Sequence, residues 1–299
     1  MTIACKFCAA ELKPESGRDT CECGFCGTVQ TIPMDLNDKK ISLFNRANRL
    51  RMSREYDRAS SVYSAIKAEY PNDAEALWGM CLCTYGIEYA KNSETGKYET
   101  TCRRITPVSI IESEYFIQVL EFADKDARQL YQGEAEIIDR IQKEYMAVVS
   151  AEPPCDVFIC CRGTADEDGY RSEDSVIAEE IFHALTEQGL KVFFAREALT
   201  GKPEPHEPYI YSALSSARVM LVIGTRFESF DDIKVKDNWG QFLAMRRIDK
   251  QKGLILCTKD VDEYDIPPEL SKFDRQDMEE QGWLQELIEK VYEQCAKID

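Results

Sequence analysis

The cysteines near the start of the chain have the spacing of metal ligands. Cys5 and Cys8 form one C-x-x-C pair, Cys23 and Cys26 form a second, and fourteen residues separate the two pairs. Together they supply four thiolates, the number that closes a tetrahedron around Zn²⁺. Since the protein would fill all four coordination positions, no position is open for a substrate. The spacing therefore predicts a structural zinc site rather than a catalytic one.

The segment that carries these cysteines, residues 1–33, is too short to bury a core of its own. Metal binding would therefore supply most of its folding free energy. Gly24 and Gly27 are expected to form the tight turns of the two pairs because glycine tolerates a positive φ. The segment resembles a zinc ribbon. Cys21 is a fifth candidate that could compete for one ligand position. The alternative to a metal site is that these cysteines are free or redox-active thiols.

The composition narrows the class of protein. The chain has 299 residues, 13 cysteines and a net charge of -17. An odd cysteine count argues against a secreted disulfide framework. The acidic charge disfavours nucleic acid as a partner, and no apolar run approaches the roughly 18 residues that span a bilayer. With no basic region followed by an apolar core at the N-terminus, we expect a cytoplasmic protein that binds neither nucleic acid nor a membrane.

The middle of the chain is predicted to be helical. Residues 34–40 have the composition of a polar linker, and apolar residues then recur at helical spacing up to about Ser150. Ala59, Tyr63 and Ile66 fall on one helix face in a segment that resembles the second helix of a tetratricopeptide repeat. A stacked array normally needs about three repeats and only one is legible. Two interpretations of this helical domain, residues 40–150, therefore remain. It could form a groove that binds a peptide or protein, or it could be a plain helical connector.

Other segments of this region are assigned by composition and spacing. Thr, Ser, Gly and Pro are frequent over 91–109, which predicts a long loop. Helices are expected to resume at 112–124 and 126–149.

The last half of the chain, residues 153–299, alternates between strand and helix patterns. Apolar strands are predicted at 157–161, 190–194, 219–223 and 254–256, and helices at 175–185, 207–216, 238–249 and 281–297. A polar loop, 162–172, follows the first strand. This alternation predicts an α/β domain with a parallel sheet covered on both faces. Ligands of such sheets bind in loops beyond the carboxyl ends of the strands.

Several ordered segments of this half carry a family resemblance. The run Cys155-Asp-Val-Phe-Ile-Cys160 is similar to the first-strand signature of the TIR (Toll/interleukin-1 receptor) domain, an aromatic residue followed by Asp-Val-Phe-Ile-Ser. Residues 189–194 resemble the second strand, and 210–224 resemble the following helix and third strand. Trp239 stands at the Trp of the family's fourth-helix region. The match covers about 155–298, and with the zinc ribbon and repeat-like helices the chain resembles a bacterial multidomain TIR protein with a flavodoxin-like C-terminal fold.

The resemblance implies one of two activities. Some TIR domains associate with one another through the BB loop, which corresponds here to residues 195–206, and so assemble signalling complexes. Others cleave the nicotinamide–ribose bond of NAD⁺ with a Glu four residues after the Trp. The residues that the resemblance assigns to partner binding in the BB loop are Leu199, Gly201, Lys202, Pro203 and Pro205.

The residue four positions after Trp239 is Leu243. Leucine can neither hydrogen-bond a ribose nor offset the positive charge of an oxocarbenium-like transition state. We therefore expect a signalling or adaptor protein whose partners are other TIR domains. The alternative is an NAD⁺ glycohydrolase, of the kind used in antiphage defence, with a substitute acid such as Glu207 or a Glu from a neighbouring subunit. The role favoured for Glu207 is instead the start of a helix, with Pro208 in its first turn.

A third interpretation is a binding module for a nucleotide-derived signal. Trp239 would then be a stacking platform, and Phe158 and Arg162 are the other predicted ligand-binding residues. Arg162 follows the first strand and could contact a phosphate. The neighbouring Arg246 and Arg247 are interpreted as a solvated helix face.

Overall fold

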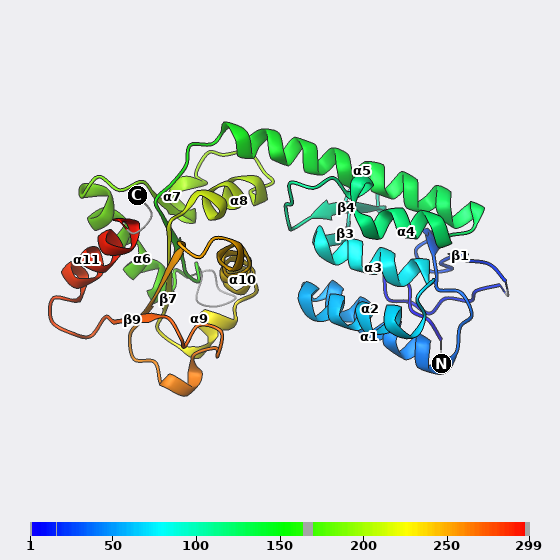
Figure 1. Cartoon of the computed structure of the whole chain (residues 1–299), viewed down its shortest axis with the longest axis horizontal. Helices are drawn as coiled ribbons and strands as arrows, with labels where there is room; N and C mark the ends of the chain where they lie inside the picture. The colour runs from blue at the N-terminus through cyan, green and yellow to red at the C-terminus, as the bar shows by residue number, and fades with distance from the viewer. Residues whose placement is uncertain (1, 16, 164–169, 297–299) are drawn as a thin grey trace. The chain divides into compact units, whose positions relative to one another are not determined.

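The computed structural model describes residues 2–15, 17–163 and 170–296, and the chain divides into two compact units, 1–147 and 148–299 (Figure 1). Hydrophobic clusters form separately within each unit. Among the described residues there is no helix with the length and apolar character needed to cross a membrane.

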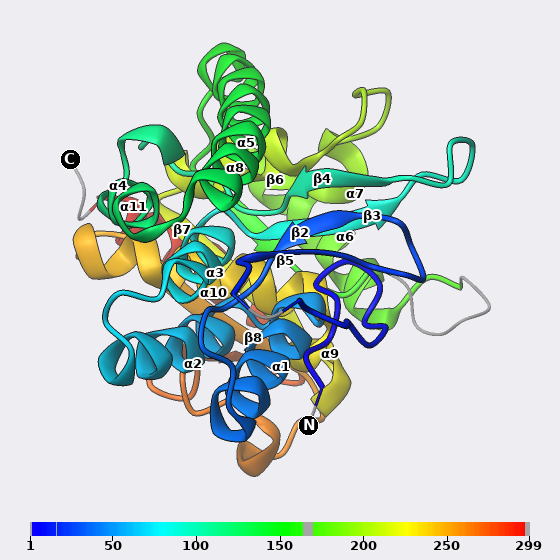
Figure 2. The same ribbon diagram turned by 90° about the vertical axis from the view of Figure 1, so that its right-hand side faces the viewer.

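The first unit joins two small hairpins to a set of helices, which Figure 2 shows from the side of this unit. Its strands are β1 (Thr20–Glu22), β2 (Val29–Thr31), β3 (Ile87–Lys91) and β4 (Tyr98–Cys102), paired β1 with β2 and β3 with β4, both antiparallel. Its helices are α1 (Asp38–Met52), α2 (Tyr56–Glu69), α3 (Ala74–Thr84), the 3-10 turn η1 (Ile110–Glu112), α4 (Glu114–Phe122) and α5 (Lys125–Ala151), whose last turn lies in the second unit.

The helices begin where a side chain can cap them. The side chains of Asn37, Asp73 and Ser113 each accept a hydrogen bond from a backbone N–H in the first turn of α1, α3 and α4. The predicted face of Ala59, Tyr63 and Ile66 is confirmed, since all three are buried on α2. Neighbouring helices approach closely at Gly79 of α3, where an added Cβ would lie 2.4 Å from the Tyr63 ring.

The predicted loop over 91–109 is wrong in its first half. Residues 87–91 and 98–102 pair as the β3–β4 hairpin, with a turn at Asn92–Lys97 in which Gly96 has a φ of 68°. Tyr, Thr and Ile favour strands, but the Ser, Asn and Gly of the turn dominate the composition of the window. The linker is also shorter than predicted, because α1 already begins at Asp38.

The second unit is an α/β fold, and its parallel sheet is confirmed. The strands are β5 (Val157–Cys160), β6 (Val192–Phe194), β7 (Val219–Gly224), β8 (Gly253–Thr258) and β9 (Asp274–Asp277). The spatial order β6-β5-β7-β8-β9, with every pairing parallel, is that of a flavodoxin-like doubly wound sheet. The helices are α6 (Glu173–Glu187), α7 (Ala195–Ala198), α8 (Glu207–Ser216), α9 (Phe227–Asp231), α10 (Ile233–Ile248), η2 (Glu263–Asp265) and α11 (Trp283–Ala296).

Alternate strand residues supply two cores, one on each face of this sheet. Val157 and Ile159 pack with α6 and α11, whereas Phe158 and Cys160 pack with α8 and α10. Figure 1 shows these helix pairs on opposite sides of the strands. This double burial explains why β5 and β7 are continuous apolar runs without a polar face.

Several elements of this unit differ from the prediction or were not predicted. Helix α10 begins at Ile233, five residues before the predicted start, because the Asp232 side chain accepts hydrogen bonds from the Lys234 and Val235 amides. Strand β9 was not predicted because its sequence, Asp-Arg-Gln-Asp, has no apolar residue. The short helices α7 and α9 are below the length at which helical periodicity can be recognised.

Candidate metal centre and the carboxyl edge of the sheet

The four predicted cysteine ligands lie together in the structure. The Sγ atoms of Cys5, Cys8, Cys23 and Cys26 all lie within 4.8 Å of one another, so the group could hold a metal ion. Cys5 Sγ is 3.8 Å from Cys26 Sγ, and Cys8 Sγ is 3.7 Å from Cys23 Sγ. A tetrahedron with Zn–S bonds of about 2.3 Å has edges of about 3.8 Å. The sulfur spacing is therefore consistent with zinc.

Both cysteine pairs are shaped by the same backbone turn. The Ala9 amide donates to the Cys5 carbonyl at 2.9 Å, and the Gly27 amide donates to the Cys23 carbonyl at 2.8 Å. Ala9 has a φ of 62° and Gly27 a φ of 70°, so the residue after each pair is left-handed. The expected role of Gly27 is confirmed, while that of Gly24 is wrong, because Gly24 does not have a positive φ.

Polar neighbours support the sulfur atoms. The Gln30 side-chain amide donates to Cys5 Sγ at 3.0 Å and accepts from the Lys6 amide at 3.0 Å. Burial opposes ionisation of Cys26, but hydrogen bonds with Thr28 outweigh it and lower the pKa of Cys26 to about 7. Burial raises the pKa of Cys8 to about 12. Because a metal binds thiolates, loading of this site must release protons.

Cys21 is not a member of the group. Its Sγ lies 3.5 Å from the Glu22 carbonyl oxygen on strand β1, and the residue belongs to the surrounding hydrophobic core. Cys21 lies on β1, whereas all four candidate ligands lie outside that strand.

The cysteine group is fastened to the helices by buried charge. Lys6, between Cys5 and Cys8, is 3 % exposed, and its Nζ lies 2.9 Å from Glu75 Oε1 on α3. Glu75 Oε2 accepts from the Thr31 hydroxyl and from the Tyr131 hydroxyl of α5. The residues around the four cysteines therefore share one core with helices α1, α2 and α3.

The predicted ligand-binding residues of the second unit have different surroundings. Phe158 and Trp239 belong to the same core cluster, and Trp239 is 6 % exposed, with its indole N–H directed to the Phe230 carbonyl at 3.4 Å. Phe158 stacks on Phe193 with ring centroids 5.0 Å apart. In this conformation both rings are packing elements, and stacking on a ligand would require the chain around them to move.

Arg162 follows β5, at the edge where the sheet would bind a ligand. Its carbonyl accepts a hydrogen bond from the Ser172 hydroxyl, which also caps α6 through the Ser175 amide. Most of the predicted 162–172 loop, residues 164–169, lies outside the described residues. At the same edge Asp174, which was not a predicted site residue, accepts from both the amide and the hydroxyl of Thr225 and so ties α6 to the end of β7.

Leu243 packs partly buried against the core cluster that contains Trp239 and Phe242. The side chain therefore continues the apolar face of α10, and no carboxylate occupies its position. Glu207, the candidate substitute acid, is the first residue of α8, with Pro208 following it. This is the helix start that the sequence favoured as the role of Glu207.

The loop predicted as the BB loop is held at its base and exposed beyond it. Lys202 Nζ lies 2.6 Å from Glu152 Oε1 and 4.8 Å from the centre of the Tyr209 ring. Leu199 is half-buried, Gly201 has a φ of 77°, and the peptide bond before Pro205 is cis. Gly201, Pro203 and Pro205 are exposed.

In comparisons with known proteins, the chain matches neither a protein-family model nor a curated protein.

Proposed function

We propose that this protein is a TIR-type signalling or adaptor protein whose C-terminal unit associates with the same unit of other copies through residues 199–206. The N-terminal cysteines would bind a structural Zn²⁺. The observation that carries the proposal is the apolar packing of Leu243, one helical turn after Trp239.

The position of Leu243 argues against the hydrolase alternative. Bond cleavage at a ribose generates positive charge, and losing one well-placed electrostatic group typically costs about 10²–10³ in rate. An aliphatic side chain that packs against the core cannot supply that group. Glu207 lies on a different element, in the first turn of α8, where its charge is favourable to the helix.

The form of the 199–206 loop supports association. Its base is fixed by the Lys202–Glu152 ion pair, and its two prolines limit the freedom of the backbone. A loop that is already rigid loses less conformational entropy on binding than a flexible one. Its exposed tip, Pro203 to Pro205, is then suited to contact a partner.

For the zinc site, the four sulfurs fit the ion and leave no coordination position to a substrate. The bound zinc would contribute folding free energy to the N-terminal segment. It would also fix the position of Lys6 against α3.

Association is tested by sedimentation of the full chain over a range of concentrations. We expect the protein to self-associate, and the charge reversal Glu204→Lys to weaken association about tenfold or more. Glu269→Lys is a matched control, because Glu269 is also exposed and also follows a proline. A protein that stays monomeric throughout, or two variants with equal effects, would contradict association through this loop.

The hydrolase alternative is tested on the associated protein by incubation with NAD⁺ and measurement of free nicotinamide. We expect no release above the uncatalysed background. Release that is abolished by Glu207→Gln would show instead that Glu207 is a catalytic acid, and the adaptor proposal would then be wrong.

A further inference from the structure

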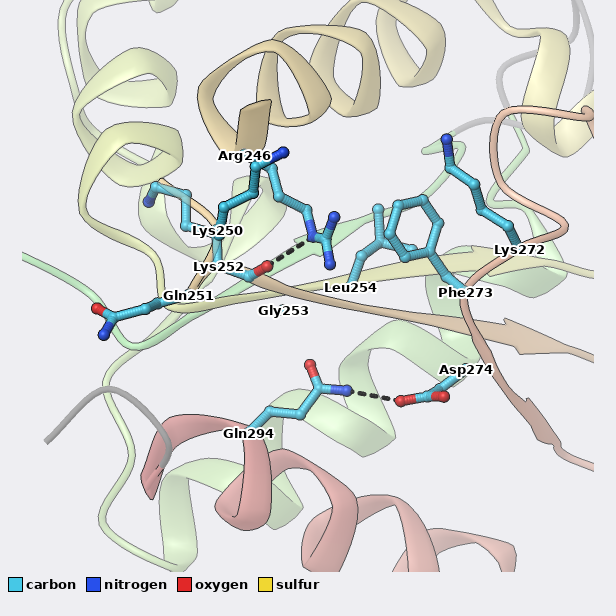
Figure 3. A pocket seen from close by; sticks show the side chains of 10 residues that line it. All are labelled: Arg246, Lys250, Gln251, Lys252, Gly253, Leu254, Lys272, Phe273, Asp274 and Gln294. Atoms are coloured by element: carbon cyan, nitrogen blue, oxygen red, sulfur yellow. Dashed lines mark hydrogen bonds between the residues drawn. The ribbon is translucent and has the colours of Figure 1, made fainter. Parts of the chain in front are cut away.

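A pocket of about 260 Å³ opens at the amino edge of the parallel sheet, where β8 and β9 begin and α10 and α11 end (Figure 3). The amino and carboxyl ends of parallel strands lie at opposite edges of a sheet. The pocket is therefore separate from the carboxyl edge, where Arg162 lies, and its role does not depend on the proposed function.

Arg246 is fixed in this pocket by two contacts. Its Nε donates to the Lys252 carbonyl at 2.8 Å, and its guanidinium lies 4.8 Å from the centre of the Phe273 ring. Figure 3 shows the guanidinium directed into the pocket. Since Nε is already bonded and the ring holds the guanidinium plane, the two terminal amino groups are positioned to meet a ligand. The sequence-based interpretation of Arg246 as a solvated helix residue is wrong, because the side chain is half-buried here.

Further cations line the same pocket. The Lys272 ammonium lies 5.5 Å from the same Phe273 ring, and Lys250 also lines the pocket. In the described ranges, none of these three side chains forms an ion pair with a carboxylate. Two cations on one ring repel each other unless an anion lies between them.

The other charged groups of the lining are already engaged. The Lys252 ammonium donates to the carbonyl oxygens of Ser215 at 2.9 Å and Ala217 at 2.6 Å, at the end of α8. Asp274 accepts from the Gln294 amide at 3.0 Å (Figure 3). Both groups keep their charge, so the lining has four cations, Arg246, Lys250, Lys252 and Lys272, and one carboxylate, Asp274, and is net positive.

This cluster stands out in an acidic protein. The chain has a net charge of -17, yet four of the seven residues from 246 to 252 are basic. A guanidinium with two parallel N–H groups matches the geometry of a phosphate, and neighbouring ammonium groups match its second charge. Pockets for drug-sized ligands usually have roughly 300–1,000 Å³, so this one suits a smaller molecule than a whole dinucleotide.

We propose that the pocket formed by Arg246, Lys250, Lys272 and Phe273 binds the phosphate group of a small ligand. The phosphate could belong to a soluble phosphate ester or to a lipid headgroup, because Ile248, which lies between the lining residues Arg246 and Lys250 in sequence, is 91 % exposed. The chemistry of recognition is the same in both cases, a phosphate bound by the Arg246 guanidinium in a pocket whose lining is net positive.

The test is a calorimetric titration of the full chain with pyrophosphate, together with sedimentation of the chain with phosphatidylglycerol vesicles. We expect saturable binding to at least one of the two. Arg246→Ala should weaken it at least tenfold and Lys272→Gln about threefold. Arg247→Ala is the matched control, because Arg247 is the next residue of α10 but is exposed and outside the pocket; it should change the affinity less than twofold.

The two probes separate the two sources of phosphate. Saturable pyrophosphate binding identifies a soluble ligand, and vesicle binding that needs Arg246 and is lost in Ile248→Ser identifies a headgroup. Binding to neither probe would overturn the proposal. An equal loss in Arg246→Ala and Arg247→Ala would overturn it as well, since it would indicate attraction by general charge alone. Lys272 is exposed, so Lys272→Gln is expected to fold. This variant therefore still tests the proposal if Arg246→Ala does not fold.

Discussion

At the scale of single residues, the cysteine group shows how backbone and side chain cooperate. Ala9 and Gly27 occupy equivalent left-handed positions after the two cysteine pairs, although only Gly27 has the residue type that this conformation favours. Ala9 adopts it because the turn between Cys5 and Ala9 is closed by a hydrogen bond at 2.9 Å. The four sulfurs are thereby brought within reach of one ion.

The membership of this group is tested by serine substitution. Cys8→Ser and Cys23→Ser should each lose the zinc, which we expect at about one ion per chain, because three thiolates no longer fill the tetrahedron. Cys21→Ser is the matched control and should retain the metal, since Cys21 lies outside the group. Metal content is measured on purified protein by mass spectrometry. Zinc lost from the Cys21 variant, or kept in the other two, would show that the ligand set is different.

A second residue-scale prediction concerns Asp19. Burial, and then the nearby Asp124 carboxylate, raise the pKa of Asp19 to about 6, above the value of about 3.9 in an unfolded chain. The folded state therefore binds a proton more tightly than the unfolded state does. Binding of this proton therefore stabilises the folded state fully below about pH 4. This stabilisation is lost as the pH rises through 6.

Asp19→Asn should accordingly stabilise the protein at pH 7, by up to about 3 kcal/mol for a shift of this size, and progressively less as the pH falls to 5. Urea unfolding of both proteins with saturating zinc gives the difference at each pH. A stabilisation that does not change between pH 5 and pH 7 would show that Asp19 does not titrate in this range.

At the scale of elements, buried charge joins the cysteine segment to helix α3. Lys6 and Glu75 are 3 % and 7 % exposed and form an ion pair at 2.9 Å. Removal of one partner of a buried pair leaves the other charge without compensation, which costs about 3–5 kcal/mol. The pair therefore fixes where the segment sits on the helices.

We expect Glu75→Gln to destabilise the N-terminal unit by about 3 kcal/mol, measured as the free energy of unfolding in urea. Lys39→Gln is the control, because Lys39 pairs with Glu69 on the surface between α1 and α2. Exposed pairs contribute little, so the control should unfold at the wild-type urea concentration. Equal stability of Glu75→Gln and the wild type would mean that the buried pair does not hold the two elements together.

At the scale of the whole molecule, the two units should respond differently to loss of metal. The cysteine segment shares its core with α1, α2 and α3, while the sheet of the second unit has separate cores. Removal of a structural metal withdraws folding free energy from the unit that binds it. The structure divides the chain into two units. The division into three domains, 1–33, 40–150 and 153–299, remains a prediction from the sequence.

Hydrogen exchange measured with and without a zinc chelator tests this difference. We expect faster amide exchange in residues 2–33 and in α3 after chelation, and unchanged exchange in β5, β7 and β8. Chelator already saturated with zinc is the control and should leave both units unchanged. Faster exchange in all three strands as well would show that the metal stabilises the chain as a whole.

Local sequence determined several parts of this protein. The spacing of four cysteines predicted their group, and helix α8, strand β7 and the buried face of α2 were predicted almost to the residue, because each is encoded by periodicity and by nearby turn residues. The parallel sheet followed from the alternation of apolar runs with helices.

Tertiary structure alone decided the rest, because the deciding contacts join residues far apart in the chain. Strand β9 has no apolar residue and forms only because β8 offers it a backbone partner. Lys6 became a buried ion only where Glu75 could meet it. Arg246 resembles its exposed neighbour Arg247 in sequence, but only Arg246 lies over Phe273, which the fold brings from 27 positions further along the chain.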